Sequence, residues 1–206
     1  MIQRIGLLSA CAPNSFSNHK KSEGDEMKGV VFTEFMDMVE QRFSADMLDD
    51  IIDDAQPASG GAYTAVGTYP HGEMVALVSA LAARSGAPVP DLLRAFGEYL
   101  FGRFVQGYPS FFKGQHDAFS FLAGIDDVIH AEVRKLYPDA ELPRFEVEHH
   151  DERCLRIVYS SGRHFEDLAE GLIVGCIAHF GQPATLRRET VGEGEQRRER
   201  FLLERR

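Results

Sequence analysis

Apolar residues recur at intervals of three and four along residues 27–181, which is the spacing of one face of an α-helix. Glycine and proline interrupt this pattern at 60–61, 70, 86–90, 107–109 and 138. The N-terminal part of the chain is therefore predicted to be mostly helical. Two of the predicted helices carry an apolar stripe that a core would bury. The stripes are Val30, Val31, Phe35, Met38, Val39 and Phe43, and Met74, Val75, Val78, Leu81 and Ala82.

Two later helices carry more specific information. Residues 92–105 are apolar almost all round, so we expect a helix that is buried on several sides and can line a cavity. A helix predicted over residues 116–137 places His130 beside an apolar face. That face consists of Ala118, Leu122, Ile125, Ile129, Val133 and Leu136. His130 thus differs in kind from the side chains around it.

The pattern changes to alternation in the last third of the chain. Residues 145–148 and 155–159 alternate apolar and polar side chains on either side of a turn-forming stretch, which predicts a β-hairpin. After a helix at 165–180, two more strands are predicted at 185–191 and 198–204. The predicted fold class is α+β, with a mostly helical N-terminal part followed by a small antiparallel sheet.

Composition and charge narrow the range of functions. The 206 residues, 44% of them hydrophobic, can bury one core and still enclose a ligand cavity. The formal net charge of −10 argues against nucleic acids and anionic membranes as partners. Three scattered cysteines without Cys-x-x-Cys spacing suggest a reducing, cytoplasmic location. We expect residues 27–206 to form a single domain, and residues 1–26 to be a disordered extension or the result of a mis-assigned start.

His130 becomes informative beside the run Tyr159-Ser160-Ser161-Gly162-Arg163. Alternate side chains of an extended chain project to one side, so Tyr159, Ser161 and Arg163 would aim two hydroxyls and a guanidinium the same way. Such donors suit a pair of carboxylates. With a helix-borne imidazole, they suggest a metal-bearing dicarboxylate ligand, which describes haem. Each half alone also fits an ordinary structure: a hydrogen-bonded boundary histidine, or a strand end with a surface arginine.

The same residues resemble the haem-nitric oxide/oxygen binding (H-NOX) family, which includes the sensor domain of soluble guanylate cyclase. The resemblance extends from residue 27 to residue 204. It rests on His130-Ala-Glu-Val-Arg-Lys-Leu-Tyr137-Pro138, Pro143-Arg-Phe145, the YxSxR run at 159–163 and Gly171-Leu172-Ile173. It implies an H-NOX-like fold with haem b buried between the distal helices and the part formed by the proximal helix and sheet.

The resemblance also implies a role for each matching position. His130 would be the axial ligand of the iron, and Tyr159, Ser161 and Arg163 would hold the haem propionates. Pro143 matches a proline that presses on the macrocycle and distorts it. Leu168 occupies the place of a distal tyrosine found in members that bind dioxygen stably. Val31, Phe35 and Leu100 are candidates for the distal wall, although ordinary core residues would look the same in sequence.

The function implied is a stand-alone gas sensor rather than an enzyme. Leucine at position 168 has no donor for bound dioxygen, so we expect ferrous haem here to take nitric oxide and carbon monoxide and to exclude dioxygen. In relatives, nitric oxide breaks the bond to the proximal histidine. The output would pass to a separate protein, such as a histidine kinase or a cyclic-di-GMP enzyme, because the chain has no room for such a domain.

Three other functions remain open from the sequence. A peroxidase-like haem enzyme would need an acid–base residue near the position of Leu168. A haem carrier or haem sensor would treat the porphyrin itself as its cargo. A haem-free interaction module would not bind haem at all.

Overall fold

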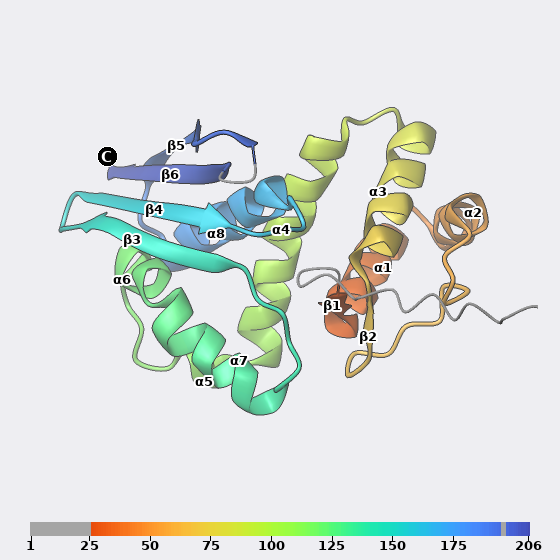
Figure 1. Ribbon diagram of the computed structural model, residues 1–206, viewed down its shortest axis with the longest axis horizontal. Coiled ribbons are helices and arrows are strands. Elements are labelled where there is room, and N and C mark those ends of the chain that lie inside the picture. Colours follow the sequence, from red (N-terminus) through yellow and green to blue (C-terminus); the bar gives the residue numbers. More distant parts are fainter. Residues whose placement is uncertain (1–25, 195–196) are drawn as a thin grey trace, which may run out of the picture.

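The computed structural model describes residues 26–194 and 197–206, so most of the extension expected at 1–26 lies outside the described residues (Figure 1). In the first half, the elements are β1 (Glu26–Lys28), α1 (Gly29–Arg42), α2 (Ala45–Ala55), β2 (Thr68–Pro70), α3 (His71–Ser85), α4 (Val89–Gly107) and α5 (Pro109–Phe112). There follow α6 (Ala118–Ala123), the π-helix η1 (Ile125–Ile129), α7 (His130–Leu136), β3 (Arg144–His150), β4 (Cys154–Ser160), α8 (Glu166–Phe180), β5 (Ala184–Val191) and β6 (Arg198–Arg205).

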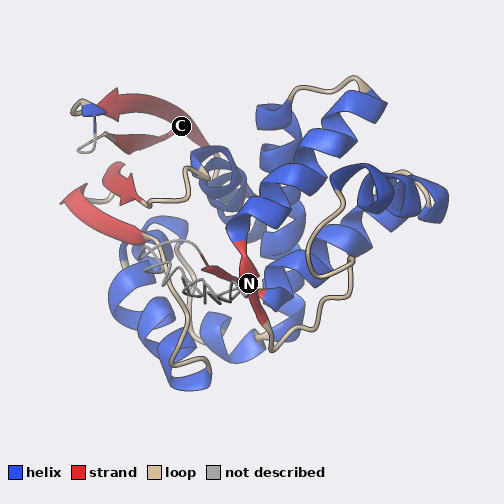
Figure 2. Cartoon of the chain, turned by 45° about the vertical axis from the view of Figure 1, so that its right-hand side comes forward, coloured by secondary structure: helices blue, strands red, loops and turns tan. Residues whose placement is uncertain are grey.

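The long helix α4 runs through the middle of the molecule, with α1, α2 and α3 on one side and the sheet, α6 and α7 on the other (Figure 1). The larger sheet is antiparallel and has the order β3-β4-β6-β5, while β1 pairs with β2. Figure 2 shows the larger sheet at one edge of the molecule, with helices making up most of the rest. The α+β class predicted from the pattern is confirmed. No helix in the described part of the chain is long and apolar enough to cross a membrane.

Two separate hydrophobic clusters form the interior. The first lies among the N-terminal helices and reaches Phe165 and Leu168 at the start of α8. The second lies between the larger sheet, α6 and α8, and includes Ile173 and Phe201. Helices α4 and α8 contribute to both clusters and therefore connect the two parts of the fold.

Glycines allow α4 and α8 to cross at very short range. A Cβ on Gly97 of α4 would lie 2.3 Å from the carbonyl oxygen of Leu168, and one on Gly171 of α8 would lie 2.1 Å from the carbonyl oxygen of Arg94. Cβ atoms do not approach other heavy atoms this closely, so the crossing requires glycine at both places. The backbone around Leu168 is thereby fixed against α4.

The stripe predicted for the first helix is only partly the buried face of α1. Phe35, Met38 and Val39 are buried, but Phe43 is 40% exposed because α1 ends at Arg42. Phe32, which the stripe leaves out, is completely buried.

The single helix predicted over residues 116–137 is wrong, because the region divides into α6, η1 and α7. Asp117 begins α6 by accepting a hydrogen bond from the backbone N–H of Ser120 at 2.7 Å. Beyond Gly124 the chain follows π-helical spacing, and the N–H of His130 bonds to the carbonyl of Ile125, five residues earlier. This spacing changes which side chains share a face with His130.

Candidate functional site

A cavity of about 270 Å³ lies between the two hydrophobic clusters. Side chains from α1, α4, α6, α7, α8, η1 and β4 line it, together with the loop before β3, and most of them are apolar. The predicted site residues that reach it are His130, Pro143, Tyr159, Arg163, Val31, Leu100 and Leu168. Residues far apart in the sequence thus meet around one apolar space.

His130 is the first residue of α7 and is 9% exposed. Its Nδ1 lies 2.7 Å from Oδ1 of Asp126. Burial lowers the pKa of His130, and the hydrogen bond with Asp126 opposes that effect. In the neutral ring Nδ1–H donates to the carboxylate, which leaves the Nε2 lone pair available to a metal. His130 therefore has the chemistry of a metal ligand on an apolar wall.

Arg163 also lines the cavity, but its contacts differ from those expected. The guanidinium donates to the carbonyl oxygens of Glu26 at 2.5 Å and Glu141 at 2.8 Å. Burial lowers the pKa of Arg163, and the nearby groups of Tyr159 and Glu141 oppose that effect. These two bonds use only part of its donor capacity, so a half-buried cation with spare N–H groups remains at the cavity.

The sequence predicted that Tyr159, Ser161 and Arg163 lie on one extended segment, but the extended strand ends before Arg163, although Tyr159 and Arg163 still line the same cavity. Strand β4 ends at Ser160, and the backbone N–H of Arg163 bonds to the Ser161 hydroxyl at 3.2 Å, which turns the chain. Tyr159, 5% exposed, stays at the cavity; burial raises its pKa, while a hydrogen bond from Ser161 opposes this. Ser161 itself lines a different space.

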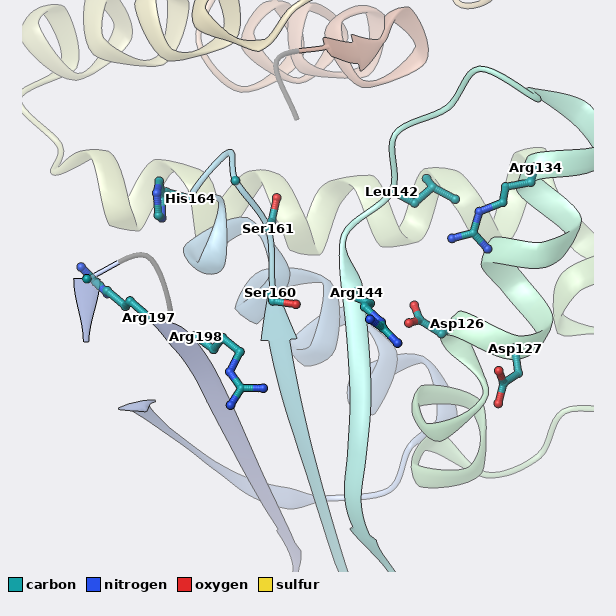
Figure 3. A pocket seen from close by; sticks show the side chains of 12 residues that line it. Asp126, Asp127, Arg134, Leu142, Arg144, Ser160, Ser161, His164, Arg197 and Arg198 are labelled. Carbon is teal, nitrogen blue, oxygen red and sulfur yellow. The ribbon is translucent and has the colours of Figure 1, made fainter. Parts of the chain in front are cut away.

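That second space is an open polar cleft next to the cavity, with a volume of about 1320 Å³ (Figure 3). Asp126 and Asp127 reach it from η1, Arg144 from β3, and Ser161 from the turn after β4 (Figure 3). Asp126 therefore lies between the buried imidazole and a face that is open to solvent.

The expected distal residues divide into two groups. Leu168 is 8% exposed, Leu100 is 2% exposed and Val31 is half-buried, and all of them line the cavity. Phe35 does not: it is completely buried in the first cluster, with its ring edge-on to Phe96 at 5.2 Å. Val31 and Phe35 lie one turn apart on α1, yet Val31 lines the cavity and Phe35 belongs to the core. The spacing of apolar residues in the sequence does not distinguish these two positions.

Other polar residues at the site were not expected from the sequence. Asp126 lies four residues before His130, a spacing that brings side chains together on a helix and would have been a usable signal. Tyr108 and Tyr137 line the cavity and interact with each other. Burial, with the interaction with Tyr137 adding to it, raises the pKa of Tyr108 to about 12. Nothing in the sequence indicates that these tyrosines pair.

The donor set fits haem. An iron porphyrin needs an apolar enclosure, one axial ligand and partners for its carboxylates. The cavity has apolar walls, an imidazole whose Nδ1 is already bonded, and a half-buried arginine that donates to two backbone carbonyls.

Comparison with known families decides which kind of protein this is. A family model described as haem-NO-binding matches residues 28–188. The chain belongs to the haem-NO-binding (H-NOX) family. Members of this family are haem-based gas sensors, and the fold expected from the resemblance is confirmed. A comparison with curated protein sequences finds no match.

Solved H-NOX structures share this fold over most of their length. The unliganded Fe(II) H-NOX protein from K. algicida is 37% identical, with a TM-score of 0.82 over 87% of this chain and 97% of that one. The H-NOX from Shewanella woodyi, bound to IWP-051 in the Fe(II)CO state, is also 37% identical, with a TM-score of 0.75 over 87% and 95%. The Fe(II)NO H-NOX protein from S. oneidensis is 28% identical, with a TM-score of 0.80 over 87% and 99%.

Proposed function

We propose that this H-NOX chain is a stand-alone sensor that holds haem b through His130, binds nitric oxide and carbon monoxide, and excludes dioxygen. One observation carries the proposal: a buried imidazole with a bonded Nδ1 lines an apolar cavity that also contains Leu168. H-NOX proteins from S. oneidensis and S. woodyi have been solved with nitric oxide or carbon monoxide bound, which supports these gases as the ligands.

The residues around the cavity would each make a different contact with haem. Haem, when bound, supplies an iron with a coordination position for a gas molecule. His130 would present Nε2 to the metal. Arg163 would donate its remaining N–H groups to a propionate, with Tyr159 and Ser161 beside it. Pro143 lines the same cavity and would contact the bound ring.

Exclusion of dioxygen would follow from the side chains near Leu168. Val31, Leu100 and Leu168 are hydrocarbon groups and offer no hydrogen bond to a ligand that carries partial negative charge. Nitric oxide and carbon monoxide need little such help, so the cavity favours them.

Signalling would begin with the release of His130 when nitric oxide binds. The freed histidine would let α7 move, and strain at Pro143 would relax. A separate partner, such as a histidine kinase or a cyclic-di-GMP enzyme, would respond if it prefers one of the two states.

The test is an anaerobic absorption spectrum of the reduced protein, before and after nitric oxide, repeated in air and with His130→Gly. We expect a haem band that changes with nitric oxide, no sign of dioxygen binding in air, and loss of the band in His130→Gly unless imidazole is added. Absence of a haem band in the wild type would refute the proposal. Loss of haem on dialysis would instead favour a carrier.

A further inference from the structure

We propose that Asp126 is a positioning residue for this site: it fixes the ring of His130 with one carboxylate oxygen and holds the start of strand β3 with the other. The inference rests on the proposed role of His130. Asp126 would do more than support haem binding, because the two groups that its carboxylate joins belong to different elements of the fold.

Both oxygens of the carboxylate are engaged. Oδ1 lies 2.7 Å from Nδ1 of His130, and Oδ2 accepts the backbone N–H of Phe145 at 3.0 Å. Asp126 is on the π-helix η1, four residues before His130, whereas Phe145 is the second residue of β3. A single side chain therefore connects the imidazole to the edge strand of the sheet.

The first bond sets the orientation and basicity of the imidazole. His130 is 9% exposed, so a bond from Nδ1–H to solvent would not easily replace the carboxylate. A carboxylate that accepts from the second ring nitrogen of a metal-bound histidine fixes its tautomer and raises the basicity of the ligating nitrogen. Asp126 would thus strengthen the bond that nitric oxide has to break.

The second bond ties the same carboxylate to the segment that carries Pro143. Phe145 lies two residues after Pro143, and its ring contacts both His130, at 5.9 Å between centroids, and Tyr159, at 5.3 Å. A displacement of His130 with Asp126 would therefore pull on the beginning of β3. Asp126 would relay the state of the histidine to the sheet and to the open cleft that it also lines.

The neighbouring Asp127 provides a matched control. It is exposed, lines the same cleft and belongs to the same π-helix, but no hydrogen bond joins its side chain to another described residue. Asp126→Asn and Asp127→Asn remove the same charge from adjacent positions. Only the first removes a carboxylate from His130.

The experiment compares resonance Raman spectra of the ferrous, gas-free holoprotein as wild type, Asp126→Asn and Asp127→Asn. An amide is a weaker acceptor than a carboxylate and has one oxygen for two donors, so we expect the iron–histidine stretching band of Asp126→Asn to shift to lower frequency. Its haem affinity should fall by about 10-fold, the lower end of the effect of losing such a partner. Asp127→Asn should match the wild type in both.

The outcomes separate this inference from the proposed function. An Asp126→Asn band at the wild-type frequency, or equal shifts in both variants, would overturn the role of Asp126 alone. A wild type without any iron–histidine band would refute the proposed function, and this inference with it.

If Asp126→Asn does not fold, the wild-type carbon monoxide complex serves instead. Slow solvent exchange of the His130 Nδ1 proton in its NMR spectrum would support the bond to Asp126, and fast exchange would overturn it.

Discussion

Replacing Leu168 with tyrosine tests whether the lack of a donor at this position excludes dioxygen. Leu168 lines the cavity and is 8% exposed, so a hydroxyl introduced there would be held in an apolar space with few competing partners. A hydrogen bond to a charged acceptor contributes about 1.5–3 kcal/mol. At 1.4 kcal/mol for each factor of ten, the affinity for dioxygen should rise by roughly 10- to 100-fold.

The measurement is the dissociation rate of dioxygen from the reduced protein, followed by stopped-flow absorption. Leu168→Phe is the matched control, because it adds a ring of almost the same size without the hydroxyl. Both variants should share any cost of overpacking, about 1–3 kcal/mol, so the difference between them isolates the donor. Equal behaviour of the two variants towards dioxygen would show that the donor argument is wrong.

Two further predictions concern the fold around the site. Gly97→Ala should lower the free energy of unfolding by about 2 kcal/mol or more in chemical denaturation, because its Cβ would meet the carbonyl oxygen of Leu168. Gly102→Ala in the same helix is the control: its Cβ would enter open space, and the change should stabilise the protein by up to about 1 kcal/mol. Equal effects of the two variants would contradict the close crossing of α4 and α8. For Asp117, burial raises the pKa but bonds from Arg205 and Ser120 outweigh it and lower the pKa from 3.8 to about 2. The stabilising effect of the ionised Asp117 is therefore complete above the unfolded pKa and is lost as the pH falls from about 4 to about 2. Denaturation midpoints of the wild type should drop more steeply over that range than those of Asp117→Asn. Parallel curves for the two proteins would contradict the lowered pKa of Asp117.

Local patterns were sufficient to predict most elements of this fold. The alternation in 155–159 and 198–204 matches β4 and β6, and the helix expected at 165–180 is α8. Alternation and helical periodicity survive in the sequence because one face of each element is buried, so these signals needed no knowledge of distant contacts.

The site was harder to predict from the sequence because its details depend on contacts between residues that are far apart in the chain. The turn at Ser161 comes from a side chain that bonds to the backbone two residues later, which overrides the extended spacing assumed for Tyr159 to Arg163. Phe35 and Val31 are both apolar positions of one predicted helix, and the sequence does not show that Phe35 packs into the first cluster against Phe96. The role of Asp126 required knowledge of where Phe145 lies.

The arrangement of two hydrophobic clusters around one cavity affects how long the chain would survive in a cell. A cofactor seated between the clusters would complete the interior, and a ligand that binds only the folded state stabilises it by mass action. A newly made chain that has not yet acquired haem would then unfold more often and be exposed to proteases. The abundance of the sensor would follow the haem supply, so that molecules unable to respond to gas would also be the first to be degraded.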